Sequence, residues 1–301
     1  MISNLDPSAQ QFLNDLNRIS AAMNTAQQQM SSGLKVSSVS DAPDQISTLL
    51  QARAGLSSTQ QVLSNLSRQT AEVNTGEQSL ESAVQLFEQV RTLGAEGATP
   101  TITADQRATL SGQIGAIMQQ LVGLAGTTVE GRYIFSGDSD QQTPYTIDLT
   151  QANPVSGYLG SAATRVAQHP NGTTFPLALT AQQVFDSADP TTNVFASMNT
   201  LRTALANNDS TGILNAMDGM PKVDSYLNDQ LAFYGTTQNR ITDATSYGQN
   251  LQTELQSQIS NLQDADLTNA ILELTQAQTQ QQAALTARAQ LPRTTLFNFL
   301  G

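Results

Sequence analysis

The chain has 301 residues, no cysteine and no tryptophan, and only 13% of its residues are charged. A net charge of −12 without clustered Lys and Arg argues against a nucleic-acid partner, because phosphate neutralisation needs a basic patch. The lack of cysteine excludes disulfides and thiol chemistry, and no apolar run approaches the roughly 18–20 residues that span a bilayer.

The first predicted element is an amphipathic helix over residues 5–30. Its apolar positions alternate by four and three residues, at Leu5, Ala9, Phe12, Leu16, Ile19, Met23, Ala26 and Met30. This heptad spacing predicts a helix that packs on a partner helix. Because so narrow a stripe cannot close a core alone, we expect the segment to be marginal until it is packed. The first twenty residues lack a basic region followed by an apolar one, so we expect no cleaved signal peptide.

Residues 31–44 interrupt this helix. Gly33, alternating Ser and Val, and Pro43 are typical of a loop or a short extended piece, and Pro43 is well placed to open the next helix. The four–three spacing then resumes from Asp44 to Phe87 and predicts a helix of about fifty residues that ends in a Gly-rich stretch. A capping box at Thr103 to Gln106 opens a third helix.

The character of the chain changes at residues 131–137, GRYIFSG, which are aromatic and β-branched. They lead into a region rich in Gly, Pro, Asn and Thr that ends near Pro190. Within it, Asn171-Gly172 separates residues 164–169 from 173–179, which predicts a β-hairpin. We therefore expect a small β-rich insert.

Helical spacing returns at Val194 and runs as a long stripe from Val223 to Leu262. After a skip at residues 261–267, the stripe continues through Leu267, Ile271 and Leu274 into a Gln- and Ala-rich tract that contains Leu285.

The predicted fold is mainly α, a long coiled-coil helical bundle with nested N- and C-terminal segments and the small insert. The predicted domains are 1–43 with 262–301, which are terminal assembly segments; 44–135 with 191–261, a long-helix core; and 136–190, the outer insert. The predicted assembly interface consists of Leu5, Phe12, Leu16, Ile19, Met23, Met30, Leu267, Ile271, Leu274 and Leu285.

Two sequence motifs carry a resemblance to a known family. Residues 31–47, SSGLKVSSVSDAPDQIS, resemble the signature that follows the first helix of bacterial flagellins, although Ala42 stands where a second Asp is usual. Asp264, Ala265 and Asp266 resemble the family's C-terminal Asp-Ala-Asp helix, and LFNFL at 296–300 resembles its apolar tail. The chain is identified as a member of the flagellin family over roughly residues 1–135 and 195–301.

The resemblance implies a structural subunit of the flagellum rather than an enzyme, exported through the flagellar secretion system without a cleaved signal and located outside the cell. GRYIFSG followed by Thr143-Pro144-Tyr145 resembles the hook–filament junction group of the family. Its partners would be other copies, a hook-associated protein on the hook side, flagellin on the filament side and an export chaperone. We expect no nucleic-acid partner and no membrane insertion. A short or minor flagellin that forms the filament itself is the alternative, and a secretion-tip translocator that binds host membrane is a more distant one.

Candidate chemistry elsewhere is sparse, and we expect no catalytic, cofactor-binding or metal site and no cofactor. His169 is the single histidine, so a surface-loop position is favoured over a ligand. Asp138-Ser139-Asp140 lacks the Gly and Glu of a calcium loop and is interpreted as a turn. Asp264 and Asp266 fit helix capping better than paired catalytic carboxylates. Arg91 is expected to be a solvated residue or to form a salt bridge between subunits, in preference to a receptor-binding role.

Overall fold

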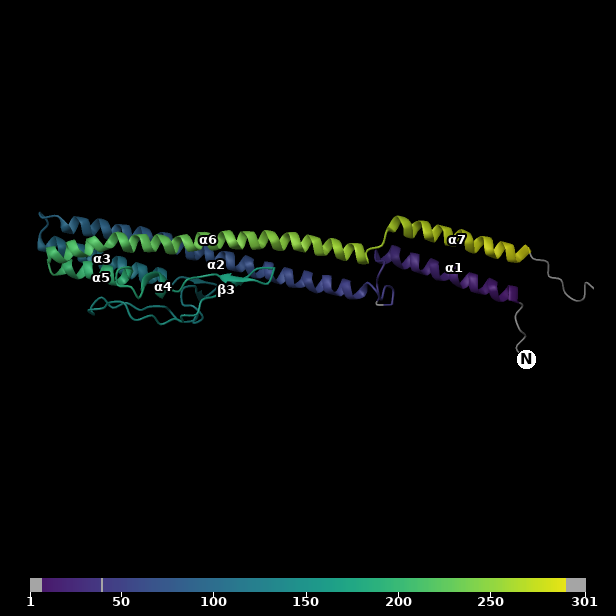
Figure 1. The fold of residues 1–301 in the computed structure, drawn as a ribbon, viewed down its shortest axis with the longest axis horizontal. Coiled ribbons are helices and arrows are strands. Elements are labelled where there is room, and N and C mark those ends of the chain that lie inside the picture. Colours follow the sequence, from purple (N-terminus) through teal and green to yellow (C-terminus); the bar gives the residue numbers. More distant parts are fainter. Residues whose placement is uncertain (1–6, 39, 291–301) are drawn as a thin grey trace, which may run out of the picture. The chain divides into compact units, whose positions relative to one another are not determined.

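The computed structural model describes residues 7–38 and 40–290 and is mainly α-helical, which confirms the predicted fold class (Figure 1). The chain separates into two compact units. Unit 1 comprises residues 1–58 and 251–301, and unit 2 comprises residues 59–250. Unit 1 therefore combines both ends of the chain, as a nested fold requires.

The helices range from 5 to 54 residues, and the two longest far exceed the roughly 11–12 residues of an average helix. They are α1 (Pro7–Ser32), α2 (Ile46–Ala98), α3 (Ala104–Ala125), α4 (Ala181–Phe185), α5 (Val194–Ala206), α6 (Ser210–Gln263) and α7 (Leu267–Gln290). The strands are short: β1 (Thr128–Val129) pairs with β2 (Arg132–Tyr133), and β3 (Val166–Gln168) pairs with β4 (Thr174–Pro176), both antiparallel.

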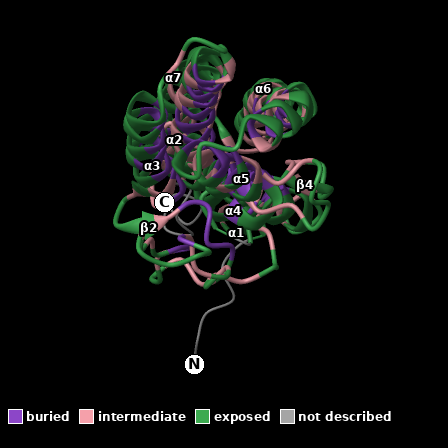
Figure 2. Cartoon of the chain, turned by 90° about the vertical axis from the view of Figure 1, so that its left-hand side faces the viewer, coloured by how far each residue is buried: buried purple, intermediate pink, exposed green. Residues whose placement is uncertain are grey.

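The core of unit 2 lies between its helices. There α2 and α6 run side by side, and α3 packs against α5 beside them (Figure 1). Viewed end-on, the buried residues lie on the inward faces of α2, α3 and α5 (Figure 2). The fully buried large side chains come from all four helices and the insert, and they include Leu66, Leu80, Phe87, Ile114, Met118, Leu121, Phe135, Phe185, Met198, Leu201 and Tyr234. This apolar cluster provides the main hydrophobic stabilisation of unit 2.

The capping box predicted at Thr103 opens α3 as expected. The Thr103 hydroxyl accepts a hydrogen bond from the Gln106 backbone N–H, and the Gln106 side chain accepts one from the Thr103 backbone N–H. The same reciprocal pair recurs at Thr180 and Gln183 before α4. Both boxes satisfy N–H groups that a helix start otherwise leaves unpaired.

The insert contains the predicted hairpin. Strands β3 and β4 pair in the register Val166↔Pro176, Ala167↔Phe175 and Gln168↔Thr174. Gly172 in the turn has φ +92°, a conformation that costs glycine little. The rest of residues 136–190 is mostly loop, with one isolated bridge between Ile147 and Val155 and the short helix α4.

The GRYIFSG segment anchors the insert to the helices of unit 2. The Phe135 ring packs edge-on against Phe185, with ring centroids 6.4 Å apart, and against Tyr234 on α6, at 6.3 Å. Its carbonyl accepts hydrogen bonds from the Ala181 N–H at 2.8 Å and from the Tyr158 hydroxyl at 3.0 Å. The aromatic character of this motif therefore serves packing inside the chain.

Candidate assembly interface

Unit 1 contains the two terminal helices, and they pack against each other. The ring of Phe12 on α1 lies 5.7 Å from the Arg288 guanidinium on α7, and Leu34 pairs with Asp264 at the other end. Since residue numbers rise along one helix as they fall along the other, α1 and α7 are antiparallel, as Figure 1 also shows. The partner helix that the heptad spacing requires is thus present in the same chain.

On α1, the predicted stripe faces inward. Ile19 and Ala26 are buried, and Phe12, Leu16 and Met23 are half-buried. Met30 is exposed, near the end of the helix. Leu5 lies outside the described residues. Most of the predicted α1 residues therefore serve the contact within the pair.

On α7, the inward residues are smaller than the sequence pattern predicts. Ala270 and Ala277 are buried, with Leu274 half-buried between them. Leu267, Ile271 and Leu285, which were predicted together with Leu274 at the assembly interface, are 49%, 49% and 50% exposed and so remain available to a neighbouring subunit. The α1–α7 pair therefore buries a mainly alanine face of α7 and leaves Leu267, Ile271 and Leu285 outside.

Unit 1 has further exposed apolar residues outside the predicted set. They are Leu13 on α1, Leu50 on α2 and Leu272 on α7, the last at 62% exposure. The sequence pattern did not single them out, because each lies off the heptad stripe that was followed. The outer apolar surface is defined here as the exposed apolar residues of the α1–α7 pair, which are Leu13, Met30, Leu267, Ile271, Leu272 and Leu285.

The rest of the α1–α7 surface is coated with amides and carries little charge. The α1 helix has eight Asn and Gln side chains and α7 has seven. Their charged residues are Asp15 and Arg18 on α1, and Glu273 and Arg288 on α7. An amide both donates and accepts hydrogen bonds, and it costs less to bury than an unpaired charge. Such a surface can give up its water to a neighbouring protein at low cost.

The two carboxylates near the start of α7 have local structural contacts. Asp266 accepts hydrogen bonds from the backbone N–H groups of Thr268 and Asn269, at 2.9 and 3.2 Å, and so caps α7 as predicted. Asp264 accepts a hydrogen bond from the Ser260 hydroxyl at 2.5 Å. The Asp264 bond joins two side chains one turn apart near the end of α6, so Asp264 caps neither helix with its carboxylate.

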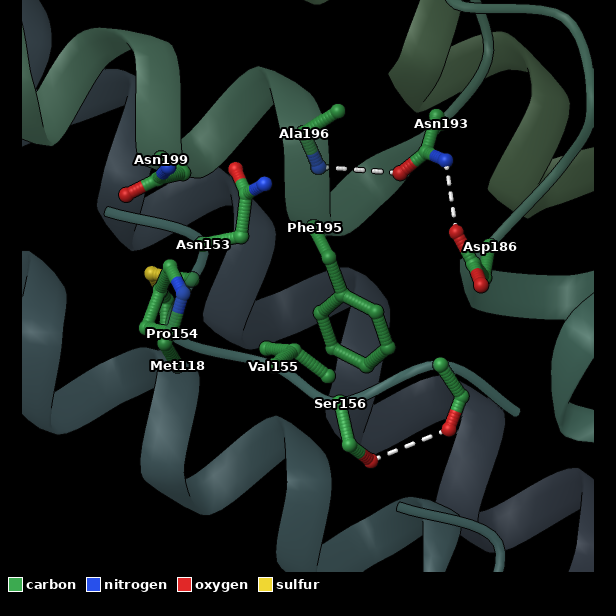
Figure 3. Close-up of a pocket in the computed structure, with 11 residues that line it drawn as sticks. Met118, Asn153, Pro154, Val155, Ser156, Asp186, Asn193, Phe195, Ala196 and Asn199 are labelled. Carbon is green, nitrogen blue, oxygen red and sulfur yellow. Dashed lines mark hydrogen bonds between the residues drawn. The ribbon is translucent and has the colours of Figure 1, made fainter. Parts of the chain in front are cut away.

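A pocket of about 240 Å³ lies in unit 2, where residues 153–157 cross the start of α5 (Figure 3). Asn193 lines it but caps α5 through the Ala196 N–H and donates to Asp186. Asn199 donates to the Ala152 carbonyl. The Asn199 bond ties the crossing segment to α5, and the Phe195 ring lies in the middle of the lining (Figure 3).

The other residues that the sequence analysis considered as candidate sites contact neighbouring residues of the same chain. His169 lies in the hairpin turn with its ring 5.0 Å from that of Tyr247, and Asp138 lies in a turn, as predicted. Arg91 pairs with Glu88 at 2.5 Å and Asp224 at 3.5 Å, so its ion pairs are formed within the chain and not between subunits as expected. Across residues 7–38 and 40–290, no group of three His, Asp or Glu side chains could hold a metal ion. Among the described helices, none combines the length and apolar character that crossing a bilayer requires.

Two family models match the chain. The bacterial flagellin N-terminal helical region matches residues 3–140, and the bacterial flagellin C-terminal helical region matches residues 217–300. Together they contain α1, α2, α3, α7 and most of α6. The two models thus cover both ends of the chain, which meet in unit 1.

Curated relatives align along most of the chain. It is 26% identical over 292 residues to "Flagellar hook-associated protein 3" of Salmonella typhimurium, which covers 86% of each chain. It is also 26% identical over 295 residues to the protein of that name from Escherichia coli, covering 90% of each.

Solved structures share the fold at low sequence identity. A putative flagellar hook-associated protein from Vibrio parahaemolyticus has a TM-score of 0.64 at 16% identity, covering 74% of this chain and all of its own. Flagellar hook associated protein-3 from Legionella pneumophila has a TM-score of 0.61 at 12% identity, covering 72% and 99%.

Proposed function

The chain belongs to the bacterial flagellin family, and we propose that it is a structural subunit that joins the flagellar hook to the filament. The observation that carries this proposal is the alignment with hook-associated protein 3, which spans 86% or more of both chains. An alignment of that length includes the insert as well as the helices. The function proposed is mechanical, and no catalytic step is part of it.

The proposed interface is the outside of the α1–α7 pair. The contact between α1 and α7 uses Ile19, Ala270 and Ala277, which leaves the outer apolar surface and the amides for neighbouring subunits. Burial of apolar side chains would supply most of the association free energy, and the amides would give up water at low cost. In this proposal residues 1–43 and 262–301 form the inner assembly segments, 44–135 and 191–261 the long-helix core, and 136–190 the outer insert.

The proposed partners follow from a position between two different protein lattices, the hook and the filament. They are other copies of the chain around the junction, a hook-associated protein on the hook side and flagellin on the filament side. We also propose that a chaperone accompanies the chain to the flagellar secretion system, which exports it without cleavage of a signal peptide. An adaptor of this kind is needed in few copies, yet flagellin cannot replace it.

Deletion of the gene tests this proposal against the minor-flagellin alternative. The expected phenotype is a cell with hooks but no attached filaments, with flagellin released into the medium. A minor flagellin predicts filaments that are shorter or altered in shape, because other flagellins still polymerise on the hook. Electron microscopy of the cells and immunoblotting of the medium separate the outcomes, and attached filaments in the deletion strain would overturn the proposal.

A further inference from the structure

The pocket at the start of α5 is a cavity that the proposed function does not use. Its volume is about 240 Å³, somewhat below the roughly 300–1,000 Å³ of pockets that hold drug-sized ligands. All of its lining residues belong to unit 2, and they come from α3, residues 153–157, the C-terminal cap of α4 and the start of α5 (Figure 3). A single small ring is therefore the size of occupant that it admits.

The apolar part of the lining is held rigidly. It includes Met118, which is fully buried, and Phe195, which is 5% exposed. The Phe195 ring stacks on Phe185, with centroids 5.7 Å apart, and packs edge-on against Tyr145, at 5.2 Å. Because these rings are already fixed, they lose little entropy when a ligand binds, and their apolar surface suits the C–H groups of an occupant.

The polar part of the lining consists mainly of asparagines, and the fold uses two of them. The Asn193 carboxamide oxygen accepts a hydrogen bond from the Ala196 N–H at 2.9 Å, and the Asn199 oxygen accepts one from the Arg202 guanidinium at 3.0 Å. Asn153 differs, since it is exposed and its side chain forms no hydrogen bond with the described residues. This free amide offers both a donor and an acceptor to a ligand (Figure 3).

Asp186 adds an acceptor to the lining. One of its oxygens accepts a hydrogen bond from the Asn193 amide at 2.8 Å, and Asp186 belongs to no ion pair among the described residues. Burial and the nearby Asp186 carboxylate raise the pKa of Tyr145. The Tyr145 hydroxyl is buried and has no hydrogen-bond partner of normal geometry within the described chain. Since buried polar groups are normally paired, these groups indicate a polar occupant close by.

The free groups of the pocket favour a hydroxylated ring over a cation or an anion. Hydroxyls donate to Asp186 and both donate to and accept from Asn153. An ammonium has no acceptor for the Asn153 N–H groups, and an anion would be repelled by Asp186, which is not part of an ion pair. A pyranose carries hydroxyls on its rim and C–H groups on its faces, so it matches both parts of the lining.

We propose that this pocket binds one pyranose unit of a saccharide, with Asp186 and Asn153 as its hydrogen-bonding residues and Phe195 in its apolar surface. The proposal goes beyond the junction function and does not depend on it. A single ring held by few hydrogen bonds should bind weakly, with a Kd on the order of 1 mM. A free sugar and the terminal unit of a glycan share this chemistry, and the experiment separates them.

Nuclear magnetic resonance of the methionine methyl groups tests the proposal on the full chain. The seven methionines are isotopically labelled, and Met118→Leu, which conserves volume, identifies the Met118 signal. The chain is titrated with glucose, galactose or N-acetylglucosamine. We expect at least one of them to shift the Met118 signal saturably, while sorbitol, an open-chain polyol, and butylamine, a cation, leave it in place. Tighter binding of a disaccharide of that sugar identifies a glycan end as the ligand, and equal binding identifies the free sugar.

Two substitutions locate the binding in the pocket. Asp186→Asn should weaken saccharide binding roughly tenfold, because an amide oxygen is a weaker acceptor than a carboxylate. Asn153→Ala should weaken it roughly two- to tenfold and should not disturb the fold, because the Asn153 side chain has no bond to lose. Asp138→Asn and Asn207→Ala, at exposed positions of unit 2 outside the lining, are the matched controls. All four variants should show the Met118 signal of the natural chain before sugar is added.

Three results would overturn the proposal. If none of the three sugars shifts the Met118 signal, the pocket does not take this class of ligand. If sorbitol or butylamine shifts it equally, the pocket recognises hydroxyls or charge without the ring. If Asp186→Asn and Asn153→Ala both bind as tightly as their controls, the sugar binds elsewhere. Each of these results would leave the junction function intact, because the deletion phenotype tests that function separately.

Discussion

Tyr234 on α6 occupies the space that a side chain at Gly76 on α2 would need. A Cβ built on Gly76 would lie 2.5 Å from the Tyr234 ring, closer than real Cβ contacts come. Tyr234 is fully buried, and its hydroxyl accepts a hydrogen bond from the Leu179 N–H at 3.3 Å. The ring therefore connects α2, α6 and the insert, and it has little freedom to move.

Gly76→Ala should destabilise unit 2 by about 1–3 kcal/mol, the usual cost of overpacking a core. Gly112→Ala on α3 is the matched control, since a Cβ there meets nothing within 4 Å. The control should be neutral or should stabilise by roughly 0.5–1 kcal/mol, because alanine favours the helix. Urea unfolding followed by circular dichroism measures both variants. Equal stabilities would contradict the packing described for Tyr234.

The ion pair between Arg165 in the insert and Glu72 on α2 should matter for stability. The two side chains are 2.7 Å apart and largely buried. Arg165→Met should cost about 2–3 kcal/mol at neutral pH, because it leaves a carboxylate inside without its partner. Arg132→Met is the control. The Arg132 side chain is 63% exposed and pairs with Asp140 at 3.5 Å, so its loss should cost less than about 1 kcal/mol.

The same variant should show a pH dependence of defined sign. Burial raises the pKa of Glu72 above its usual 4.5, and Arg165 opposes this shift. Without Arg165 the pKa of Glu72 in the folded state rises further, so the folded protein takes up a proton more readily than the unfolded one. The penalty of Arg165→Met should be largest above that folded-state pKa and should shrink as the pH falls toward 4.5. A penalty that is constant with pH would contradict this account.

The outer apolar surface can be tested at Ile271. Ile271→Asp should prevent filament attachment while leaving secretion of the subunit intact, since a carboxylate buried between subunits costs several kcal/mol. Leu214→Asp is the control, because Leu214 is 59% exposed on α6 in unit 2. If Ile271→Asp complements the deletion strain as efficiently as Leu214→Asp does, this face is not an interface. Ile19→Asp would be a less specific test of this surface, because Ile19 also supports the pairing of α1 with α7.

Local patterns allowed much of the fold to be predicted. The α1 stripe, the capping box at Thr103 and the hairpin at Asn171-Gly172 each depend on residues a few positions apart, so the sequence alone contains the signal. The face of α7 is different. Both the alanines and the larger apolar residues recur at helical spacing, and only the contact with α1 decides that Ala270 and Ala277 turn inward.

Long-range features could not be predicted in this way. The bridge between Leu34 and Asp264 joins two linkers whose spacing in the sequence carries no information about their contact.

A proline inside a helix is another feature that the sequence did not explain. Pro221 lies inside α6, where proline usually costs roughly 3 kcal/mol or more. The helix continues because Met220 and Val223 on either side are buried in the core of unit 2, and burial offsets the lost hydrogen bond.

The position of the subunit along the flagellum tests the junction function most directly. Ala188 is exposed in the insert, and the chain has no other thiol, so Ala188→Cys can be labelled with a fluorescent maleimide on intact flagella. The unsubstituted chain is the control for labelling of other proteins. The account predicts a single spot of label where the hook meets the filament. Label distributed along the filament would contradict it and would identify the chain as a filament-forming flagellin.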